Sequence, residues 1–273
     1  MADQLKLIEI FKDTLEKCKS DQKLIEYTKK MQAGTSIYLD GFVSVFRNEK
    51  SDGNNITVVG DTTFSCAKKN IAPESKTAVL NFANAFTPGG SVKEGYMAQE
   101  ECLCRSSNLY EALTMPYIYR NYYKWHDKNA GDMASDRIIY SKDVTVFKND
   151  NTYPEYMEEW FNVDIITCAA PYYDKHKKKP VTKEKLQQVF TDRIKNILEV
   201  AAANDIDVLI LGAFGCGAFN NPPEMVAEIF RFWLIEKGYA KCFKKVIFAI
   251  KNSDGADVNF DTFTKVFTKQ EIK

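Results

Sequence analysis

Apolar and polar positions along the chain follow two periods, and each period predicts a different kind of element. Near the amino end, apolar side chains recur at helical spacing and predict an amphipathic helix over residues 5–19. Ser20 and Asp21 are suitable N-cap residues for a second helix, which we expect to end before Gly34. The pattern therefore predicts a helical N-terminal extension over residues 1–34.

Beyond residue 34 the pattern predicts strands that alternate with helices, most clearly in the C-terminal half. The expected strands are residues 36–39, 42–46, 56–59, 78–83, 138–140, 144–147, 163–170, 208–211 and 245–250. The expected helices are residues 98–115, a long helix from residue 181 to a stop at residues 204–205, a helix that begins at Pro222, and residues 261–266. Residues 208–211 are wholly apolar, which suits a strand covered on both faces. The alternation favours an α/β fold with three layers, α/β/α.

No linker, low-complexity tract or internal repeat divides the sequence. We therefore expect one domain over residues 1–273, which includes the helical extension.

Apolar residues make up 45% and charged residues 27% of the chain, as is usual for a soluble globular protein. Lys plus Arg equal Asp plus Glu at 37 each, and this balance argues against broad, non-specific binding to nucleic acid. The local basic run at residues 175–179 is expected to be a solvated loop.

The chain has seven cysteines, an odd number, and none lies in a Cys-x-x-Cys pair. Since only His126 and His176 could add imidazole ligands, we expect reduced thiols and no metal site. Both histidines lie in polar surroundings and are expected at the surface, whereas the aromatic cluster from Tyr117 to Trp125 is expected to pack against other side chains.

The charged N-terminus lacks an apolar signal region, and no apolar run approaches the roughly 20 residues of a membrane span. We therefore expect a cytoplasmic monomer with no membrane partner.

The first segment with chemical content runs from Asn81 to Glu101. A predicted strand leads into a loop that contains Gly89 and Gly90, and a helix then begins near an acidic triplet. The two glycines permit positive φ and a close approach of ligand to backbone, and open α/β sheets bind ligands in such loops. Taken alone, the same residues also fit a simple turn followed by acids that the helix dipole favours.

The second segment runs from Gly212 to Pro223, where another apolar strand ends in a glycine-rich turn before a helix. Successive amides followed by a helix N-terminus form an anion site that suits a diphosphate. Phe214 and Phe219 flank this loop and could pack against a sugar or a base, or could simply belong to the core. The loop lacks the features of a P-loop or a dinucleotide fingerprint. Two such loops, one of them acidic, favour a phosphorylated sugar as ligand.

These segments resemble the signature of the microbial-type poly(ADP-ribose) glycohydrolases, a family that joins a Gly-Gly-Gly loop to a Gln-Glu-Glu triplet. The matching residues are Asn81-Phe82-Ala83-Asn84, Gly89-Gly90-Ser91 and Gln99-Glu100-Glu101-Cys102-Leu103-Cys104-Arg105. The segment from Gly212 to Pro223 is similar to the family's diphosphate-binding loop. The resemblance implies a three-layer macrodomain-like fold with a mixed central sheet. It also implies hydrolysis of ribose–ribose bonds in ADP-ribose polymers, which releases ADP-ribose without a cofactor or a metal.

The resemblance further implies a role for each residue around the acidic triplet. Glu101 would be the catalytic acid, which protonates the departing ribose oxygen and then accepts a proton from water. Glu100 would bind and orient the ribose hydroxyls beside it. Asn84 would hydrogen-bond the ribose at the scissile end, and Gln99 would contribute to ADP-ribose binding.

The resemblance assigns the two loops to the rest of the ligand. Gly89 and Gly90 would crowd the second phosphate and the distal ribose. The residues that would wrap the diphosphate are Gly215, Cys216, Gly217, Ala218 and Phe219. Cys216 would supply its backbone and small size rather than a nucleophilic thiolate. Ser91 replaces the third glycine of the family's loop, a departure that concerns loop geometry and catalytic efficiency more than ligand class.

Two other functions stay open at this point. One is a protein that binds ADP-ribosylated partners without catalysis. Ser91 in place of the family's third glycine would be the sequence feature that indicates it. The other is a hydrolase for single ADP-ribose units on protein or nucleic acid. Because the chain has no net charge, nucleic acid is the lesser substrate. The expected partners are ADP-ribose or poly(ADP-ribose) on modified proteins.

Overall fold

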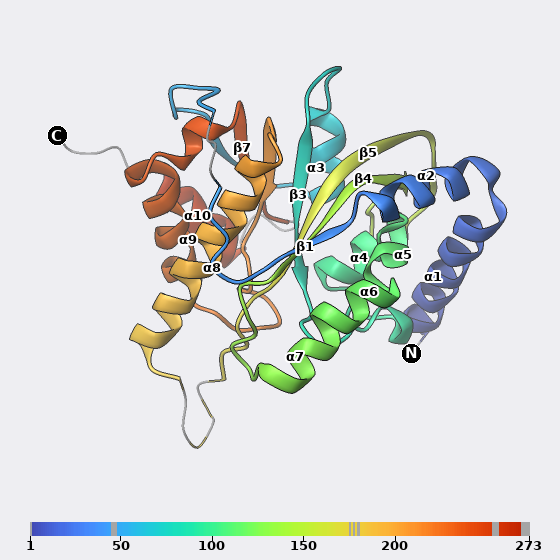
Figure 1. Ribbon diagram of the computed structural model, residues 1–273, viewed down its shortest axis with the longest axis horizontal. Helices are drawn as coiled ribbons and strands as arrows, with labels where there is room; N and C mark the ends of the chain where they lie inside the picture. Colours follow the sequence, from blue (N-terminus) through green and yellow to red (C-terminus); the bar gives the residue numbers. More distant parts are fainter. Residues whose placement is uncertain are drawn as a thin grey trace.

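The computed structural model describes residues 2–44, 48–174, 176, 178, 181–252 and 257–268. These residues form a mixed seven-stranded sheet between two layers of helices (Figure 1). The strands are β1 (Ser36–Tyr38), β2 (Ile56–Val59), β3 (Thr77–Ala83), β4 (Ile138–Lys148), β5 (Tyr156–Ala169), β6 (Val208–Leu211) and β7 (Lys245–Ala249). Their order is β1-β4-β5-β3-β6-β7-β2, antiparallel from β1 to β5 and parallel from β5 to β2. The predicted three-layer α/β/α architecture is confirmed.

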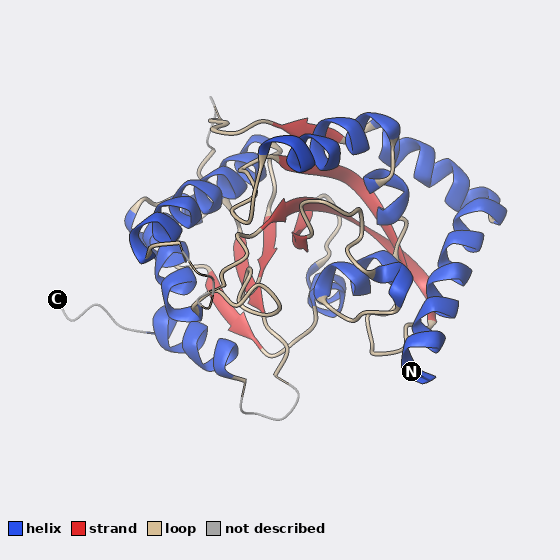
Figure 2. Cartoon of the chain, turned by 90° about the horizontal axis from the view of Figure 1, so that it is seen from below, coloured by secondary structure: helices blue, strands red, loops and turns tan. Residues whose placement is uncertain are grey.

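The helices cover both faces of the sheet (Figure 2). They are α1 (Ala2–Ser20), α2 (Gln22–Ala33), α3 (Thr63–Asn70), α4 (Gln99–Ser106), α5 (Leu109–Leu113), α6 (Pro116–Ile118), α7 (Lys124–Asn129), α8 (Lys183–Ala203), α9 (Pro223–Arg231) and α10 (Val258–Thr268). Short 3-10 or π segments are η1 (Val92–Glu94), η2 (Tyr119–Tyr123), η3 (Phe232–Glu236) and η4 (Tyr239–Cys242). Helices α8, α9 and α10 lie on one side, and α1, α2, α4 and α5 lie on the other (Figure 1).

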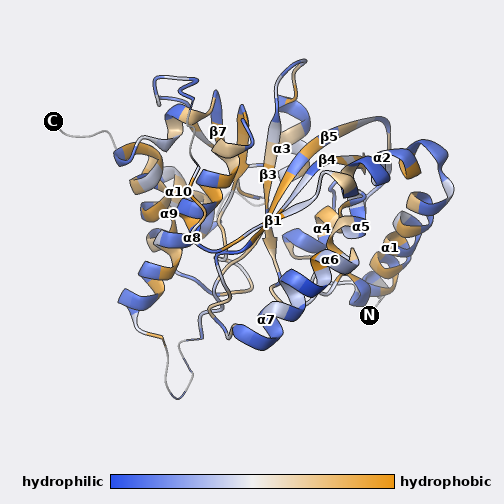
Figure 3. Cartoon of the chain, viewed as in Figure 1, coloured by the Kyte–Doolittle hydropathy of each residue, from blue (hydrophilic) through white to orange (hydrophobic). Residues whose placement is uncertain are grey.

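Each face of the sheet has its own hydrophobic core because successive strand residues point to opposite faces. On β3, Leu80 packs into the core beneath α8, α9 and α10, whereas its neighbour Val79 packs into the core beneath α1, α3 and α5. Figure 3 shows the result: hydrophobic residues dominate the central strands, and hydrophilic residues are concentrated on the surrounding helices and loops. The central strands β3 and β6 are therefore buried on both sides, as their apolar sequences predict.

The N-terminal helices pack into the second of these cores. Asp21 caps α2 as predicted, because its carboxylate accepts a hydrogen bond from the Leu24 amide at 3.0 Å. Phe11 of α1 and Met31 of α2 are buried in this core. The ring of Phe11 meets the ring of Tyr110 edge to face, with 5.0 Å between centroids. We infer that the extension belongs to the single domain and shares its core.

Five parallel strands end on the same edge of the sheet. They are β2, β3, β5, β6 and β7, which end at Val59, Ala83, Ala169, Leu211 and Ala249. Since β3 and β6 are direct neighbours, the loop after Ala83 and the loop after Leu211 leave the sheet side by side. The fold therefore brings together the two glycine-rich segments, which are more than a hundred residues apart in the sequence.

Most predicted elements are present within a few residues of their expected bounds, but some predictions are wrong. The expected strands 138–140 and 144–147 are one strand, β4, with a bulge at which Asp143 has a φ of 56°. The polar residues of that bulge break the apolar alternation, which is why the sequence shows two strands. Residues 42–44 form no strand, and residues 45–47 lie outside the described part of the chain, as do three residues of the basic run.

The predicted helix over residues 98–115 is two helices, α4 and α5, separated at Ser107. Ser107 is extended, with φ −147° and ψ 176°, and forms a bridge with Val146 of β4. The side chain of Asn108 accepts a hydrogen bond from the Thr145 amide at 2.8 Å. Ser107 and Asn108 thus pair with β4 instead of continuing the helix, and the chain changes direction between α4 and α5.

We expect Phe11→Ala to destabilise the protein by about 3–5 kcal/mol, because the side chain is 2% exposed and its removal leaves a cavity beside Tyr110. The matched control is Leu5→Ala on the same helix, where the side chain is 62% exposed and the expected change is within about 0.5 kcal/mol. Urea unfolding measures both free energies. Equal effects of the two substitutions would contradict the view that the extension is part of the core.

Candidate active site

The predicted acidic triplet forms the first turn of α4, and Gln99 fixes that turn to the sheet. The Gln99 side-chain oxygen accepts a hydrogen bond from the Phe82 amide at 2.8 Å, and its nitrogen donates to the Leu80 carbonyl at 2.7 Å. The same nitrogen donates to the Thr63 hydroxyl at 3.1 Å. The amide of Gln99 therefore acts as an extra strand partner for the end of β3. Its role in the fold is to position the two glutamates that follow it.

Glu100 is 2% exposed, and three donors hold its carboxylate. The Asn84 amide donates at 2.7 Å, the Asn81 side chain donates at 3.3 Å, and the Gly89 amide also donates. Burial raises the pKa of Glu100 to about 8, and the neighbouring charge of Glu101 adds to this effect, whereas the hydrogen bonds oppose it. A carboxyl group with this pKa retains its proton at neutral pH.

Glu101 is 6% exposed, and its two carboxylate oxygens have different environments. Oε1 accepts a hydrogen bond from the Ser91 amide at 2.9 Å. Oε2 is buried and has no hydrogen-bond partner among the described residues. Since an unpaired buried oxygen is costly, Oε2 is the atom that a bound ligand would satisfy.

The loop over these carboxylates requires glycine at two positions. Gly89 and Gly90 have φ values of 69° and 57°, which L residues rarely adopt. A β-carbon added at Gly90 would overlap Oε1 of Glu101, and one added at Gly89 would lie 2.9 Å from the Tyr110 ring. Ser91, by contrast, has a φ of −99°. The departure from the family's third glycine therefore causes no backbone strain.

Asn84 closes the start of this loop. Its side-chain oxygen accepts hydrogen bonds from the Phe86 amide at 2.8 Å and the Thr87 amide at 3.0 Å. Its own backbone amide holds Glu100. The side-chain nitrogen is the part of Asn84 left for a ligand, so its predicted contact with ribose is restricted to donation.

The second loop presents consecutive amide donors. Gly215 has a φ of 74°, and a β-carbon there would lie 2.5 Å from the Ala170 side chain. The buried Asn221 side chain donates to the Gly215 carbonyl at 2.8 Å and fixes the turn. The backbone amides of Gly217, Ala218 and Phe219 donate to no acceptor in the described part of the chain. Three adjacent free donors at the edge of the sheet form a site suited to phosphate oxygens.

A cavity of about 420 Å³ lies where the parallel strands end. Five of the predicted site residues line it: Gln99, Gly215, Gly217, Ala218 and Phe219. The other seven, Asn84, Gly89, Gly90, Ser91, Glu100, Glu101 and Cys216, are not among its lining residues. The second loop thus lines the cavity, whereas the two buried carboxylates do not and meet it only through Gln99, the residue before them in the chain. Contact between Phe82 and Phe214, with 5.7 Å between ring centroids, joins the two loops at their bases.

The cavity also has an acidic end that the sequence did not predict. Asp61 follows β2, and its carboxylate accepts hydrogen bonds from the Thr62 amide at 2.9 Å and from Lys69 at 2.6 Å. Burial opposes ionisation of Asp61, but these hydrogen bonds outweigh it and lower the pKa. Asp150 lies at the start of α3, where it accepts a hydrogen bond from the Phe64 amide at 2.7 Å. The available signal was a glycine and an aspartate directly after the predicted strand 56–59.

Burial disfavours the thiolate form of the cysteines near the site. Burial raises the pKa of the Cys216 thiol to about 12, and it also raises the pKa of Cys102. All seven cysteines are free.

Within the described residues, no group of three or more His, Cys, Asp and Glu side chains could hold a metal. None of the described helices has the length and apolar content needed to cross a bilayer.

The prediction for one histidine is wrong. His126 is fully buried, because it faces inward from α7 and hydrogen-bonds its ring to Tyr122 and Ser135. His176 is exposed, as predicted. In the aromatic cluster, Tyr122 and Tyr123 are buried as expected, whereas Tyr117 and Tyr119 are exposed, so the packing prediction holds only in part. Burial together with the Glu100 charge raises the pKa of Tyr123. These rings form part of the apolar surroundings that disfavour ionisation of Glu100.

The raised pKa of Glu100 predicts how stability depends on pH. A carboxyl group whose pKa is higher in the folded protein than in the unfolded chain binds its proton more tightly when folded. The resulting stabilisation is complete below pH 4.5, the ordinary value, and is lost as pH rises through about 8. Glu100→Gln should therefore gain stability relative to the native protein between pH 5 and 9, by on the order of 2–4 kcal/mol. Urea unfolding at both pH values measures this difference.

The control for this prediction is Glu9→Gln, which makes the same chemical change at an exposed position of α1. Its stability relative to the native protein should stay constant between pH 5 and 9. A parallel pH dependence of Glu100→Gln and the native protein would contradict a protonated, buried Glu100.

Comparison with known proteins identifies relatives of this chain. The family described as "Microbial-type PARG, catalytic domain" matches residues 6–149. Poly(ADP-ribose) glycohydrolase (PARG) from Thermomonospora curvata is 28% identical, with a TM-score of 0.82 over 95% of this chain and 98% of that one. PARG from Deinococcus radiodurans, solved in complex with ADP-ribose, is 31% identical, with a TM-score of 0.74 over 88% and 96%. No curated protein is significantly similar to the chain.

The family match includes the glycine loop, the acidic triplet and the N-terminal helices, and so covers more than half of the chain. The structural match extends the similarity to 95% of the chain. The predicted macrodomain-like fold is therefore confirmed. The chain belongs to the microbial-type poly(ADP-ribose) glycohydrolase family.

Proposed function

We propose that this chain hydrolyses the ribose–ribose glycosidic bonds of ADP-ribose polymers and releases ADP-ribose. The observation that carries the proposal is the pair of buried carboxylates, Glu100 and Glu101, held under the Gly89-Gly90 loop at the end of the sheet. Among the described residues Oε2 of Glu101 has no hydrogen-bond partner, and Gln99 of the same helix lines the cavity that the second glycine-rich loop also lines. Family membership supports the same activity.

We place ADP-ribose across the two loops. The free amides of Gly217, Ala218 and Phe219 would bind the diphosphate, with Phe219 against the distal ribose. That ribose would then lie at the buried carboxylates, where the side-chain nitrogen of Asn84 would donate to it. The remaining length of the ligand would extend through the cavity toward Asp61, whose carboxylate can accept hydrogen bonds from the amino group of adenine.

The chemistry we propose uses the two glutamates for different tasks. Glu101 would protonate the departing ribose oxygen as the glycosidic C–O bond breaks through an oxocarbenium-like transition state. Its carboxylate would then take a proton from water, whose oxygen bonds to the anomeric carbon. Glu100, with its pKa near 8, would carry a proton at neutral pH and hydrogen-bond the ribose hydroxyls. No cofactor or metal is part of this proposal.

Ser91 is compatible with catalysis. Its negative φ leaves the loop conformation intact, and its amide holds Oε1 of Glu101 in place. The substitution for glycine therefore does not support a catalytically silent reader. The proposed partners are ADP-ribose polymers on modified proteins, and seven free thiols fit a protein that works in the reducing cytoplasm.

We expect Glu101→Gln to reduce kcat on poly(ADP-ribose) by at least roughly a hundredfold, because the proton donor is removed. The Kd for ADP-ribose should change by less than about threefold, since glutamine retains an oxygen for the Ser91 amide. Steady-state kinetics and calorimetry measure the two quantities. The matched control is Glu94→Gln, which changes an exposed glutamate of η1 and should leave both unchanged. Full turnover by Glu101→Gln would rule out this assignment.

A further inference from the structure

His126 is a buried titratable residue that the proposed chemistry does not use. Its Nδ1 atom lies 2.7 Å from the Tyr122 carbonyl, and its Nε2 atom lies 2.9 Å from the Ser135 hydroxyl. A carbonyl can only accept a hydrogen bond, so Nδ1 carries the ring proton. Nε2 is then the acceptor, and the Ser135 hydroxyl donates to it. The ring links α7 to the loop that follows it.

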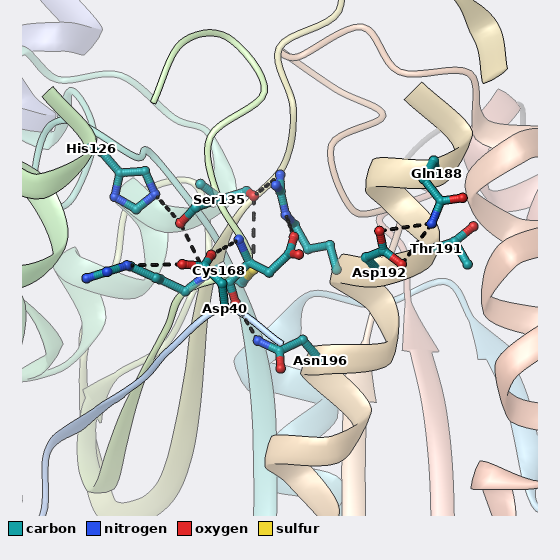
Figure 4. A network of polar contacts seen from close by, with 12 residues as sticks. Asp40, His126, Ser135, Cys168, Gln188, Thr191, Asp192 and Asn196 are labelled. Atoms are coloured by element: carbon teal, nitrogen blue, oxygen red, sulfur yellow. Dashed lines mark hydrogen bonds and ion pairs between the residues drawn. The ribbon is translucent and has the colours of Figure 1, made fainter. Parts of the chain in front are cut away.

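The loop that the His126 ring contacts through Ser135 is the α7–β4 loop, residues 130–137. Figure 4 shows His126 and Ser135 facing each other on one side of the loop, with Asp40 and Asn196 approaching it from other elements. The Ser135 oxygen accepts a hydrogen bond from the Arg137 amide at 3.2 Å. Thus the hydroxyl of Ser135 has a donor and an acceptor, and both of its contacts define the shape of the loop.

The other end of the network fastens the loop to α8 and to the chain after β1. Arg193 of α8 is buried and donates to the Asp136 carboxylate at 3.0 Å. Asn196 donates to the Asp136 carbonyl, and the Asp40 carboxylate accepts a hydrogen bond from the Asp136 amide at 2.8 Å. Asp136 is therefore fixed from three directions, and His126 adds a contact to the preceding residue, Ser135.

The α7–β4 loop reaches the second glycine-rich loop through two hydrogen bonds. The Asp132 carbonyl accepts from the Tyr172 amide at 2.7 Å, and the Tyr173 amide donates to the Phe219 carbonyl at 3.0 Å. The rings of Tyr172 and Phe219 also meet edge to face, with 6.1 Å between centroids. The position of Phe219 consequently depends on the segment that Asp132 holds.

His126 also contacts the first glycine-rich loop directly. The Phe86 ring meets the imidazole edge to face, with 6.3 Å between centroids. Phe86 lies two residues after Asn84 and donates its amide to the Asn84 side chain. One buried ring thus touches the loop that holds the carboxylates and, through Ser135, the loop that supports Phe219. Neither His126 nor Ser135 lines the 420 Å³ cavity, so any effect on the ligand is indirect.

We propose that His126 is a positioning residue, which uses its hydrogen bond from Ser135 to hold the two ligand-binding loops at the spacing that ADP-ribose requires. The inference rests on the proposed function. It assigns His126 no contact with substrate and no proton transfer. Its effect is on binding, because Phe219 and Asn84 are the groups that move when the contact is lost, while Gln99 still fixes the glutamates to β3.

The test compares three substitutions. Ser135→Ala removes the donor, and His126→Asn keeps the bond to Tyr122 but is too short to reach Ser135. His126→Gln restores an oxygen that can accept from Ser135. We expect the first two to weaken ADP-ribose binding and to raise KM for the polymer by roughly tenfold, with kcat reduced by less than about threefold. His126→Gln should bind within about twofold of the native protein.

The double substitution tests whether the two residues act through one contact. Ser135→Ala also removes the acceptor of the Arg137 amide, so the double variant with His126→Asn should bind ADP-ribose no more weakly than the weaker of the two single variants, because both substitutions remove the bond between Ser135 and His126. Additive losses would overturn the proposal. The matched control is Asn129→Ala, which removes a side-chain hydrogen bond to Trp125 on the same helix without involving Ser135, and which should bind normally.

Three measurements are made on every variant: the Kd for ADP-ribose by calorimetry, KM and kcat on poly(ADP-ribose), and Tm by thermal unfolding. Native affinity in folded Ser135→Ala and His126→Asn would overturn the positioning role while leaving the proposed function intact. If the native protein itself neither binds ADP-ribose nor cleaves the polymer, the proposed function fails, and the inference fails with it. Because Ser135→Ala removes only a hydroxyl from a half-buried residue, it tests the proposal even if His126→Asn does not fold.

Discussion

The backbone of Gly90 lies so close to the carboxylates of Glu100 and Glu101 that no side chain fits between them. This close approach lets amides of the same loop donate to both carboxylates while protein surrounds them. Burial then raises the pKa of Glu100, and one oxygen of Glu101 has no hydrogen-bond partner within the described part of the chain. The rest of the structure supports this arrangement: Gln99 fixes α4 to β3, and Tyr110, braced by α1, lies against the loop at Gly89.

Much of the fold could be predicted because its central strands are buried on both faces and its N-terminal helices are amphipathic. Residues 208–211 are apolar throughout, and the first half of α8 has buried apolar residues at helical spacing, Leu186, Phe190 and Ile194, so both elements are visible in the sequence. The bulge at Asp143 and the break at Ser107 were not predictable in this way. Both depend on pairing with a strand distant in the sequence, and local periodicity contains no information on that partner.

The site was predictable where glycine and acid residues are adjacent to predicted strands, and only there. The structure brings the two predicted loops together because β3 and β6 are parallel neighbours. Asp61 was missed because a single aspartate after a strand is common, and its importance comes from the cavity that it lines. His126 was placed at the surface because its neighbours in sequence are polar, whereas Ser135 and Phe86 bury it in the fold.

The central claim is that the carboxylates beneath the Gly89-Gly90 loop cleave the bond between ADP-ribose units. The most direct measurement is to incubate the native protein with automodified poly(ADP-ribose) and, separately, with a mono-ADP-ribosylated protein, and to quantify free ADP-ribose by mass spectrometry. The account predicts release of ADP-ribose from the polymer. If ADP-ribose binds but none is released from the polymer, or if release occurs only from the mono-ADP-ribosylated protein, the account is contradicted.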